Sequence, residues 1–195
     1  MKYNTPGNQN EVLPNIQELK FLEDIAISEF EGFLKTEILL TEALTKRTKF
    51  NAKYILKIHK LALSHLYSFA GKYRDVNLSK GGFPFAAARF LPSTMALFEN
   101  EILLKLPHNY ANTDELIKDI ATVHGELLFI HPFREGNGRT ARILANLMAR
   151  KQGYGPLMFD KIGEKEFELY VLAVQAAANK DYQKMEQLIR FIFPG

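Results

Sequence analysis

The sequence predicts an all-α fold that carries one short β-hairpin. Apolar residues recur at helical spacing through most of the chain, whereas one stretch near its middle alternates as a strand does. A length of 195 residues with 47% hydrophobic content is enough for one substantial core. We therefore expect a polar N-terminal arm over residues 1–14 and a single domain over residues 15–195.

The first part of the domain is expected to be helical. A long helical region with a break is predicted from Ile16 to about Lys46. A second helix follows from Asn51 to Ser68, because its apolar residues recur every three or four positions, and Gly71 ends it. Residues 73–79 and 84–91 then form the expected hairpin, whose tip is Lys80, Gly81, Gly82 and Phe83.

Helices are expected again in the second half of the chain. With their caps where the sequence offers one, they run from Ser93 or Thr94 to Leu106, from Thr113 to Ile130, from Arg139 to Lys151, from Lys165 to Ala178 and from Asp181 to Phe193. His124 lies within the apolar stripe of one of these helices. We interpret it as a core histidine with satisfied hydrogen bonds.

One twelve-residue stretch combines the groups needed to handle a nucleoside triphosphate. It reads His131-Pro132-Phe133-Arg134-Glu135-Gly136-Asn137-Gly138-Arg139-Thr140-Ala141-Arg142. Gly136 and Gly138 allow the backbone amides around Asn137 to turn toward an anion. A helix follows at once, so this turn lies at a helix N-terminus, which favours phosphate. Arg139 and Arg142 share one face of that helix and add positive charge.

The other polar side chains of the stretch suit an in-line transfer. A neutral His131 can take a proton from a hydroxyl near neutral pH. Glu135 supplies the hard oxygen that Mg²⁺ shares with phosphates and water. Arg139 and the amides beside it can stabilise charge on a phosphate, while Arg142 offers a second planar fork to the terminal one. These residues describe the attack of a protein hydroxyl on a nucleotide phosphorus. Phe133 is interpreted as a core residue.

This stretch resembles the signature of the Fic family, H-x-F-x-[DE]-G-N-G-R-x-x-R, and matches it at every fixed position. Residues 69–77 also look like the family's lead into its hairpin, and the resemblance covers a core of about residues 51–193. It implies a Fic-type helical bundle with a β-hairpin, the flap, over the active site. The edge of such a hairpin can accept an extended segment of a target protein, so Lys80, Gly81, Gly82 and Phe83 are the expected docking residues.

The resemblance also implies the reaction. A Tyr, Thr or Ser hydroxyl of a target protein would attack the α-phosphate of ATP, and pyrophosphate would leave. His131 would be the catalytic general base and Glu135 would hold Mg²⁺. The ATP-binding residues would be Gly136, Asn137 and Gly138 at the anion hole, with Arg139 and Arg142 at the β- and γ-phosphates. By family analogy, the targets include type II topoisomerase subunits such as DNA gyrase.

Two alternatives to adenylylation stay open. Doc-type relatives, which are protein kinases, carry lysine where this chain has Gly138, so Gly138 disfavours kinase chemistry. The second alternative is a non-catalytic nucleotide-binding regulatory module, and the intact His131 and Glu135 argue against it.

Regulation is expected to come from another polypeptide. Many Fic proteins carry an inhibitory helix, [ST]-x-x-x-E-[GN], whose glutamate pairs with the second motif arginine. The nearest candidate is Glu31-Gly32, but Ile27 stands where Ser or Thr is required, and Ser28 comes one place late. The resemblance is therefore to the toxin-like class with a separate small antitoxin, which would place its own glutamate against Arg142.

Composition excludes several other classes of protein. The chain has no cysteine, which rules out disulfides, thiol catalysis and cysteine zinc sites, and its histidines lack metal-ligand spacing. The net charge of +3 is mild and the basic residues are dispersed, so we expect no direct contact with nucleic acid. Residues 1–13 contain no apolar signal region and no run approaches a membrane span, so we expect a cytoplasmic protein without a membrane partner.

Overall fold

The computed structural model describes residues 12–194, so most of the predicted N-terminal arm lies outside the described residues. The described elements are, in order, α1 (Leu22–Glu42), α2 (Ala52–Leu63), β1 (Ser79–Lys80), β2 (Phe83–Pro84), a 3₁₀ turn (Ala88–Phe90), α3 (Leu91–Glu101), a 3₁₀ turn (Leu103–Lys105), α4 (Thr113–Ile130), α5 (Asn137–Lys151), a 3₁₀ turn (Phe159–Lys161), α6 (Glu164–Ala177) and α7 (Gln183–Ile192). The prediction of an all-α fold with one short hairpin is confirmed.

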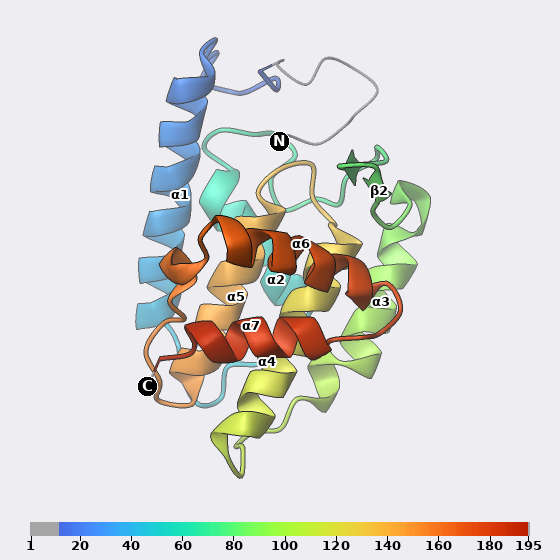
Figure 1. The fold of residues 1–195 in the computed structure, drawn as a ribbon. Coiled ribbons are helices and arrows are strands. Elements are labelled where there is room, and N and C mark those ends of the chain that lie inside the picture. Colours follow the sequence, from blue (N-terminus) through green and yellow to red (C-terminus); the bar gives the residue numbers. More distant parts are fainter. Residues whose placement is uncertain (1–11, 195) are drawn as a thin grey trace.

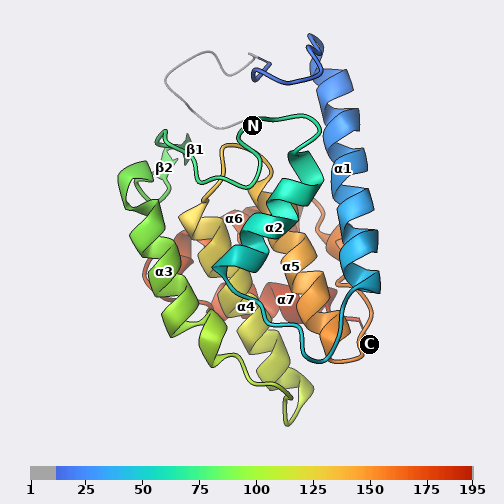
Figure 2. The ribbon, with the colours of Figure 1, turned by 180° about the vertical axis from the view of Figure 1, so that it is seen from behind.

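Helices α4 and α5 form the centre of the bundle. They pack against each other, and α6 and α7 cover one face of the pair (Figure 1). From behind, α2 lies over the opposite face, with α1 and α3 at the two edges (Figure 2). Most of α5 is buried, from Thr140 and Ala141 through to Ala149. The loop that joins α4 to α5 is therefore held by the two best-packed helices of the molecule.

The first helix begins later than the sequence predicts. Helix α1 starts at Leu22 rather than at Ile16, and it runs to Glu42 without the expected break. The side chain of Asn15 accepts a hydrogen bond from the N–H of Leu19 at 2.8 Å, and the N–H of Ile16 donates to the carbonyl of Leu66 at 2.9 Å. These bonds hold residues 15–19 in a turn against the segment that follows α2. The apolar residue Ile16 thus marks a tertiary contact rather than a helical turn.

The hairpin is shorter than predicted, although its turn is confirmed. Only Ser79 pairs with Pro84 and Lys80 with Phe83. Both turn glycines have positive φ, 57° and 81°, as a two-residue hairpin turn of this kind requires. One more backbone bond, from the N–H of Phe85 to the carbonyl of Leu78, crosses the hairpin beyond these pairs. Further along, the guanidinium of Arg74 takes the carbonyls of residues 76 and 86.

Other helix ends shift by a few residues. Helix α2 ends at Leu63 rather than at Ser68, since a turn follows it. Helix α3 begins at Leu91 and ends at Glu101, so neither Ser93 nor Thr94 caps it and it stops short of Leu106; a proline in its first turn starts it instead. Helix α4 starts at Thr113 as predicted, but its cap is Asn112, whose side chain accepts from the N–H of Glu115 at 2.9 Å.

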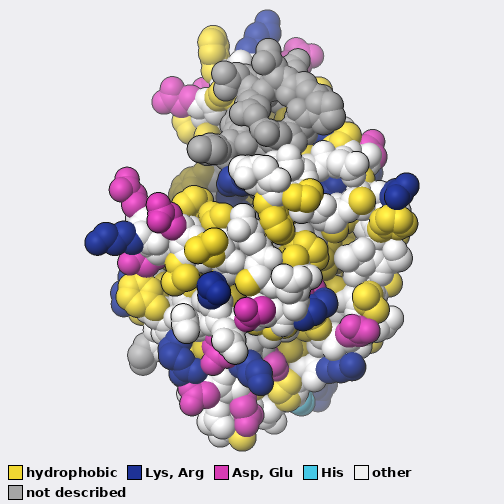
Figure 3. Space-filling model, turned by 45° about the vertical axis from the view of Figure 1, so that its right-hand side comes forward, with side chains coloured by type: hydrophobic (Ala, Val, Ile, Leu, Met, Phe, Trp, Pro, Cys, Tyr) yellow, Lys and Arg dark blue, Asp and Glu magenta, His cyan; other side chains and the backbone are white. Residues whose placement is uncertain are grey.

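The surface carries mixed charge. On the face shown in Figure 3, lysine and arginine side chains lie interspersed with aspartate and glutamate, in agreement with the dispersed charges of the sequence. Within residues 12–194, no helix has the length and apolar character needed to cross a membrane.

Candidate active site

The motif forms the loop between α4 and α5 and the first turns of α5. His131 ends α4 with a left-handed backbone conformation, φ 52°, and Gly136 precedes α5 with φ 76°. The first hydrogen bond within α5 runs from the N–H of Thr140 to the carbonyl of Gly136. The amides of residues 137–139 therefore have no acceptor inside the helix, and they make its N-terminus a place where an anion is stabilised.

Asn137 braces this loop from within. Its Oδ1 accepts from the N–H of Phe133 and its Nδ2 donates to the carbonyl of Phe133, both at 2.8 Å. The ring of Phe133 is fully buried and stacks on His59, with ring centroids 3.8 Å apart. The Asn137 side chain thus shapes the loop, which leaves its backbone amide as the group that can face an anion. Phe133 is a core residue, as the sequence indicated.

The two motif glycines differ in what surrounds them. A Cβ on Gly136 would lie 2.9 Å from Cζ of Phe33, and its positive φ already disfavours other residues. A Cβ on Gly138 would meet nothing within 4 Å. Gly136 is therefore required by packing and backbone conformation, whereas Gly138 borders open space at the start of α5.

His131 lies beneath the flap. The residue is 5% exposed, and its ring stacks on Phe85 with centroids 3.8 Å apart. Its Nδ1 donates to the carbonyl of Leu128 at 2.8 Å, so Nε2 is the basic ring nitrogen. Burial lowers the pKa of His131 to about 3, with a smaller contribution from the cations of Arg74 and Lys80. The imidazole is therefore neutral at physiological pH.

Arg74 joins the histidine to the flap, a role that sequence reasoning did not assign. Its Nε donates to the carbonyl of His131 at 2.7 Å. Its two terminal nitrogens donate to the carbonyls of Val76 at 2.6 Å and Ala86 at 2.5 Å, on the two sides of the hairpin. Because one buried guanidinium holds all three carbonyls, the flap and the backbone of His131 are fixed relative to each other.

Glu135 lies on the other side of the loop. Its Oε1 accepts from the N–H of Gly136 at 2.8 Å and lies 3.5 Å from a nitrogen of Arg139. Its carbonyl accepts from Nε2 of His59 at 3.0 Å, and Nδ1 of the same ring accepts from the N–H of Gly71 at 2.8 Å. Burial lowers the pKa of His59 to about 4, so this ring is neutral and bridges two backbone segments.

One carboxylate in this position fits a magnesium ion that completes its shell with phosphate oxygens and water. Within residues 12–194, no group of three or more histidine, aspartate or glutamate side chains could hold a metal ion alone. A divalent ion at Glu135 would thus be shared with a bound polyphosphate rather than enclosed by the protein.

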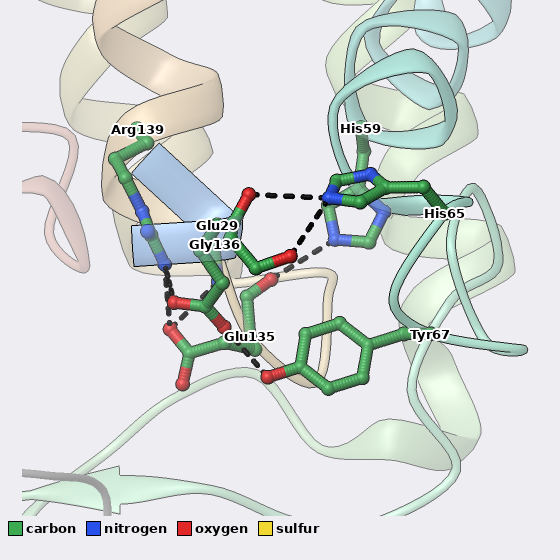
Figure 4. A network of polar contacts seen from close by, with 8 residues as sticks. Glu29, His59, His65, Tyr67, Glu135, Gly136 and Arg139 are labelled. Atoms are coloured by element: carbon green, nitrogen blue, oxygen red, sulfur yellow. Dashed lines mark hydrogen bonds and ion pairs between the residues drawn. The ribbon is translucent and has the colours of Figure 1, made fainter. Parts of the chain in front are cut away.

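The two motif arginines contact different neighbouring segments. Arg139 points toward α1, where it bonds to Glu29 at 2.7 Å (Figure 4). Its guanidinium also lies over the ring of Phe33, 4.6 Å from the ring centroid. Arg142 points toward the segment before α6, where it lies 5.3 Å from the ring centroid of Phe159. Its buried Nε has no hydrogen-bond partner among the described residues. One arginine is held in place, and the other retains donor capacity.

Glu29 is a site residue that sequence reasoning passed over. We considered Glu31 on this helix, yet the side chain of Glu31 is exposed and pairs with Lys35 at 3.2 Å. Glu29 is 7% exposed and lies among the buried residues of α1. The sequence did contain a signal for its burial, because Glu29 lies four positions from Ile25 and four from Phe33 and so shares their apolar helix face.

His124 has the structural role that the sequence indicated. It is 1% exposed, its Nε2 lies 2.6 Å from the hydroxyl of Tyr170 and its Nδ1 lies 3.2 Å from the carbonyl of Ala141. Burial lowers its pKa to about 3. Tyr170 is buried as well and packs between α6 and α4, which agrees with a packing role for this residue.

The tip of the flap reaches the helices beside it. The ammonium group of Lys80 lies 6.0 Å from the ring centroid of Phe167 on α6, and the ring of Phe83 lies 6.3 Å from that of Phe129 on α4. A Cβ on Gly81 or on Gly82 would meet nothing within 4 Å. The two turn glycines therefore lie clear of the bundle, whereas the side chains on either side of them reach it.

Comparison with known proteins agrees with this geometry. A family model described as the Fic/DOC family matches residues 49–149. The protein adenylyltransferase VbhT of Bartonella schoenbuchensis is 31% identical over 118 residues, which are 60% of this chain and 24% of that protein. The protein adenylyltransferase Fic of Nematostella vectensis is 33% identical over 108 residues, 53% of this chain and 24% of that protein. The chain thus spans about a quarter of the length of these relatives.

Solved structures share the fold along nearly the whole chain. The N-terminal FIC domain of Bep8 from Bartonella sp. 1-1C has a TM-score of 0.79 at 20% identity and covers 96% of this chain and 92% of that one. BepC from Bartonella tribocorum, solved with bound AMPPNP, has a TM-score of 0.72 at 20% identity, with coverages of 94% and 93%. On its motif, its flap-covered histidine and a family match over more than half of its length, the chain belongs to the Fic/DOC family.

Proposed function

We propose that the chain is a protein adenylyltransferase, which transfers AMP from ATP to a Tyr, Thr or Ser hydroxyl of a target protein. The observation that carries this proposal is the placement of a neutral His131 within the loop that leads into the N-terminus of α5. The names of the related adenylyltransferases support it. A base for the hydroxyl and an anion site for the phosphates are thereby separated by one short loop.

The transfer balances as an in-line displacement. The hydroxyl oxygen of the target forms a bond to the α-phosphorus, and the bond from that phosphorus to the oxygen bridging to the β-phosphate breaks. Pyrophosphate leaves with the electron pair of that bond, and the hydroxyl proton goes to Nε2 of His131. Negative charge on a bound triphosphate raises the pKa of a nearby imidazole, so nucleotide binding strengthens His131 as a base.

The phosphates meet the residues at the start of α5. The turn of Gly136, Asn137 and Gly138 is the proposed anion hole; the N–H of Gly136 is bonded to Glu135, so the amides of Asn137 and Gly138 are the ones open to an anion. Arg139 and Arg142 bind the β- and γ-phosphates. Glu135 would hold Mg²⁺ together with the phosphates, and this ion would supply charge neutralisation. Gly138 favours this arrangement over that of a Doc-like kinase, because no side chain enters the open space at this position.

A target segment docks on the flap. The hairpin has only two residues in each strand, so the outer edge beside Lys80, Gly81, Gly82 and Phe83 can accept an extended chain as an added strand. A type II topoisomerase subunit remains our proposed target by family analogy. Our proposed location for the activity is the cytoplasm, where ATP is available.

A separate small antitoxin is the proposed inhibitor of this toxin-like activity. Helix α1 exposes apolar side chains at helical spacing, among them Ile27, Phe30, Leu34 and Ile38, each with about half or more of its surface accessible. A partner helix could cover this stripe and place a glutamate against Arg142, whose Nε has no partner among residues 12–194. Glu31 does not serve as an internal inhibitor in this account, since it pairs with Lys35 at the surface.

Labelled ATP separates the proposed reaction from its alternatives. The chain is incubated in a bacterial lysate with ATP labelled at either the α- or the γ-phosphate, beside a His131→Ala control. Protein labelled only from the α-phosphate, and only by the unaltered chain, is the expected result. Label from the γ-phosphate would establish kinase chemistry, and no label from either position would favour a nucleotide-binding module.

A further inference from the structure

Glu29 is the carboxylate of α1 that faces the site. Its residue is 7% exposed, and it belongs to the buried face of a helix whose neighbouring glutamates are accessible to solvent. A buried carboxylate is destabilising unless charged or hydrogen-bonding groups compensate it. The partners of Glu29 therefore indicate why the position tolerates it.

Two strong hydrogen bonds hold the Glu29 carboxylate between the segment that follows α2 and helix α5 (Figure 4). The hydroxyl of Tyr67, a residue that is 2% exposed, donates to Oε1 at 2.7 Å. A terminal nitrogen of Arg139 donates to Oε2, also at 2.7 Å. Each carboxylate oxygen thus has its own donor, and the tyrosine fixes the carboxylate on the side away from the arginine.

Helix α1 holds the guanidinium of Arg139 in two directions. Glu29 bonds to its edge, and Phe33, one turn further along α1, lies beneath its face at 4.6 Å. Close packing keeps α1 in this place, because a Cβ on Gly32 would come within 2.0 Å of the carbonyl oxygen of Ala62 in α2. The contact with Gly136 described above brings Phe33 against the start of α5.

These contacts leave Arg139 able to bind a second anion. A guanidinium has five N–H donors in a rigid fork, and Glu29 accepts from one terminal nitrogen. The side chain of Arg139 keeps 32% of its surface accessible, whereas that of Glu29 keeps 9%. Glu29 and, at the longer distance of 3.5 Å, Glu135 both contact the same terminal nitrogen, so the N–H groups on the other two guanidinium nitrogens have no part in these bonds.

We propose that Glu29, held by Tyr67, is a positioning residue that fixes Arg139 in the orientation in which it binds the phosphates of the nucleotide. This inference rests on the proposed function, since it assigns Arg139 to phosphate binding. An arginine side chain loses several rotamers when it binds an anion, and Glu29 restricts them before the nucleotide arrives. Removal of the carboxylate should therefore weaken nucleotide binding even though it also removes a negative charge.

A second network provides a matched control. Glu126 on α4 is 2% exposed, and it accepts from the hydroxyl of Tyr182 at 2.6 Å and from the ammonium group of Lys180 at 2.9 Å. It therefore has the same kind of partners as Glu29. Its cation comes from the connection between α6 and α7 and is not part of the motif. Glu126→Gln should reduce thermal stability about as much as Glu29→Gln does.

The first experiment measures binding of the magnesium complex of ATP to the full chain by calorimetry. Glu29→Gln should raise the dissociation constant about tenfold, the order expected when an anion-binding side chain loses its orientation. Glu126→Gln and the exposed-surface variant Glu31→Gln should bind as the unaltered chain does. Unchanged or tighter binding by Glu29→Gln, at a temperature where the variant is folded, would overturn the proposal.

A double-mutant cycle tests whether Glu29 acts through Arg139. In the Arg139→Ala background, Glu29→Gln should have no further effect on the dissociation constant, because the group that it positions is gone. Additive effects would mean that Glu29 acts by another route, and they would contradict the proposal. Because both experiments measure binding, they stay informative if the chain transfers no AMP. In that case the proposed reaction would be wrong, and the binding measurements would still show whether Glu29 positions Arg139.

Discussion

Two buried glutamates among residues 12–194 have the same kinds of partner and different consequences. Glu29 and Glu126 each accept one bond from a tyrosine hydroxyl and one from a cation. The cation of Glu29 is the motif residue Arg139, whose guanidinium faces the helix N-terminus, whereas the cation of Glu126 is Lys180 in a surface connection. Burial and hydrogen bonding alone therefore do not distinguish a functional glutamate from a structural one. The distinction lies in the cation that each glutamate binds, because Arg139 belongs to the motif and Lys180 does not.

Two buried histidines, His124 and His131, show the same contrast between a structural and a site residue. In both His124 and His131, Nδ1 lies within hydrogen-bond distance of a backbone carbonyl, and burial lowers both pKa values to about 3. The Nε2 atom of His124 is bonded to the hydroxyl of Tyr170 inside the core. The ring of His131 instead lies against Phe85 of the flap segment, at the border of the site. Substitutions within the glutamate pair and within the histidine pair should therefore distinguish effects on stability from effects on nucleotide binding and transfer.

The largest expected effect is on the rate of transfer. His131→Ala should lower the rate of adenylylation by about two to four orders of magnitude, which is the usual contribution of a general base. Binding of ATP should change little, because His131 acts on the hydroxyl. His124→Ala should instead lower the melting temperature while the residual folded protein keeps its activity. Single-turnover transfer and thermal melting of both variants check this; near-normal transfer by His131→Ala would remove it from the mechanism.

Acid should destabilise the fold through the buried histidines. The pKa values of His59, His124 and His131 fall to about 4, 3 and 3, below the value of about 6.5 in an unfolded chain. Their stabilising contribution is thus complete above about pH 6.5 and is lost as the pH falls. Three such groups lower the free energy of unfolding by up to about 4 kcal/mol per pH unit.

Denaturant titrations at pH 7, 6 and 5 measure that slope. His124→Gln should reduce it by about a third, since one of the three proton-binding groups is gone. A slope that does not change in this variant would show that His124 is not the source of acid sensitivity.

Substitutions of the two motif glycines should also differ in effect, with Gly138 affecting the reaction and Gly136 affecting the stability of the fold. Gly138→Lys should leave the melting temperature nearly unchanged, because a Cβ there meets nothing, but should reduce adenylylation about a hundredfold by filling the anion hole. Gly136→Ala should lower the melting temperature, owing to its positive φ and the contact with Phe33. Unchanged transfer from the α-phosphate by Gly138→Lys would contradict the proposed geometry of the turn.

The smallest effects are expected for the two tyrosines. Tyr67→Phe and Tyr182→Phe each remove one hydrogen bond to a buried carboxylate, and each should lower the free energy of unfolding by about 1–2 kcal/mol. Only Tyr67→Phe should also weaken ATP binding, by a few-fold, since Glu29, the carboxylate that Tyr67 holds, bonds to Arg139. Equal effects of the two variants on ATP binding would erase the distinction between the networks.

Much of the fold could be predicted because its elements are defined by local patterns. The long apolar stripes of α4 and α5 and the Gly81-Gly82 turn occur where the sequence indicates. The start of α1 could not be predicted from the apolar pattern, because Asn15 forms a local side-chain turn with Leu19 and the N–H of Ile16 bonds to a tertiary partner, the carbonyl of Leu66. The length of the flap strands was also missed, since the guanidinium of Arg74, in the segment that leads into the hairpin, takes the carbonyls of residues 76 and 86 that a longer ladder would use.

The candidate site was predicted as far as it lies in one continuous motif. His131, Glu135, the glycine turn and both arginines fall within twelve residues, so spacing alone brings them together. Arg74 and Glu29 lie 57 and 110 residues from the motif positions that they contact. Helix packing creates these contacts, and no periodicity in a single sequence reports which buried carboxylate will meet which arginine.

The central claim is that this chain attaches AMP, and not phosphate, to a protein hydroxyl with His131 as the base. The most direct test is mass spectrometry of a purified target protein after incubation with the unaltered chain, ATP and Mg²⁺, beside the same reaction with His131→Ala. We predict an AMP adduct on a Tyr, Thr or Ser residue in the first reaction and an unmodified target in the second. A phosphate adduct, or an AMP adduct that His131→Ala forms equally well, would contradict the account.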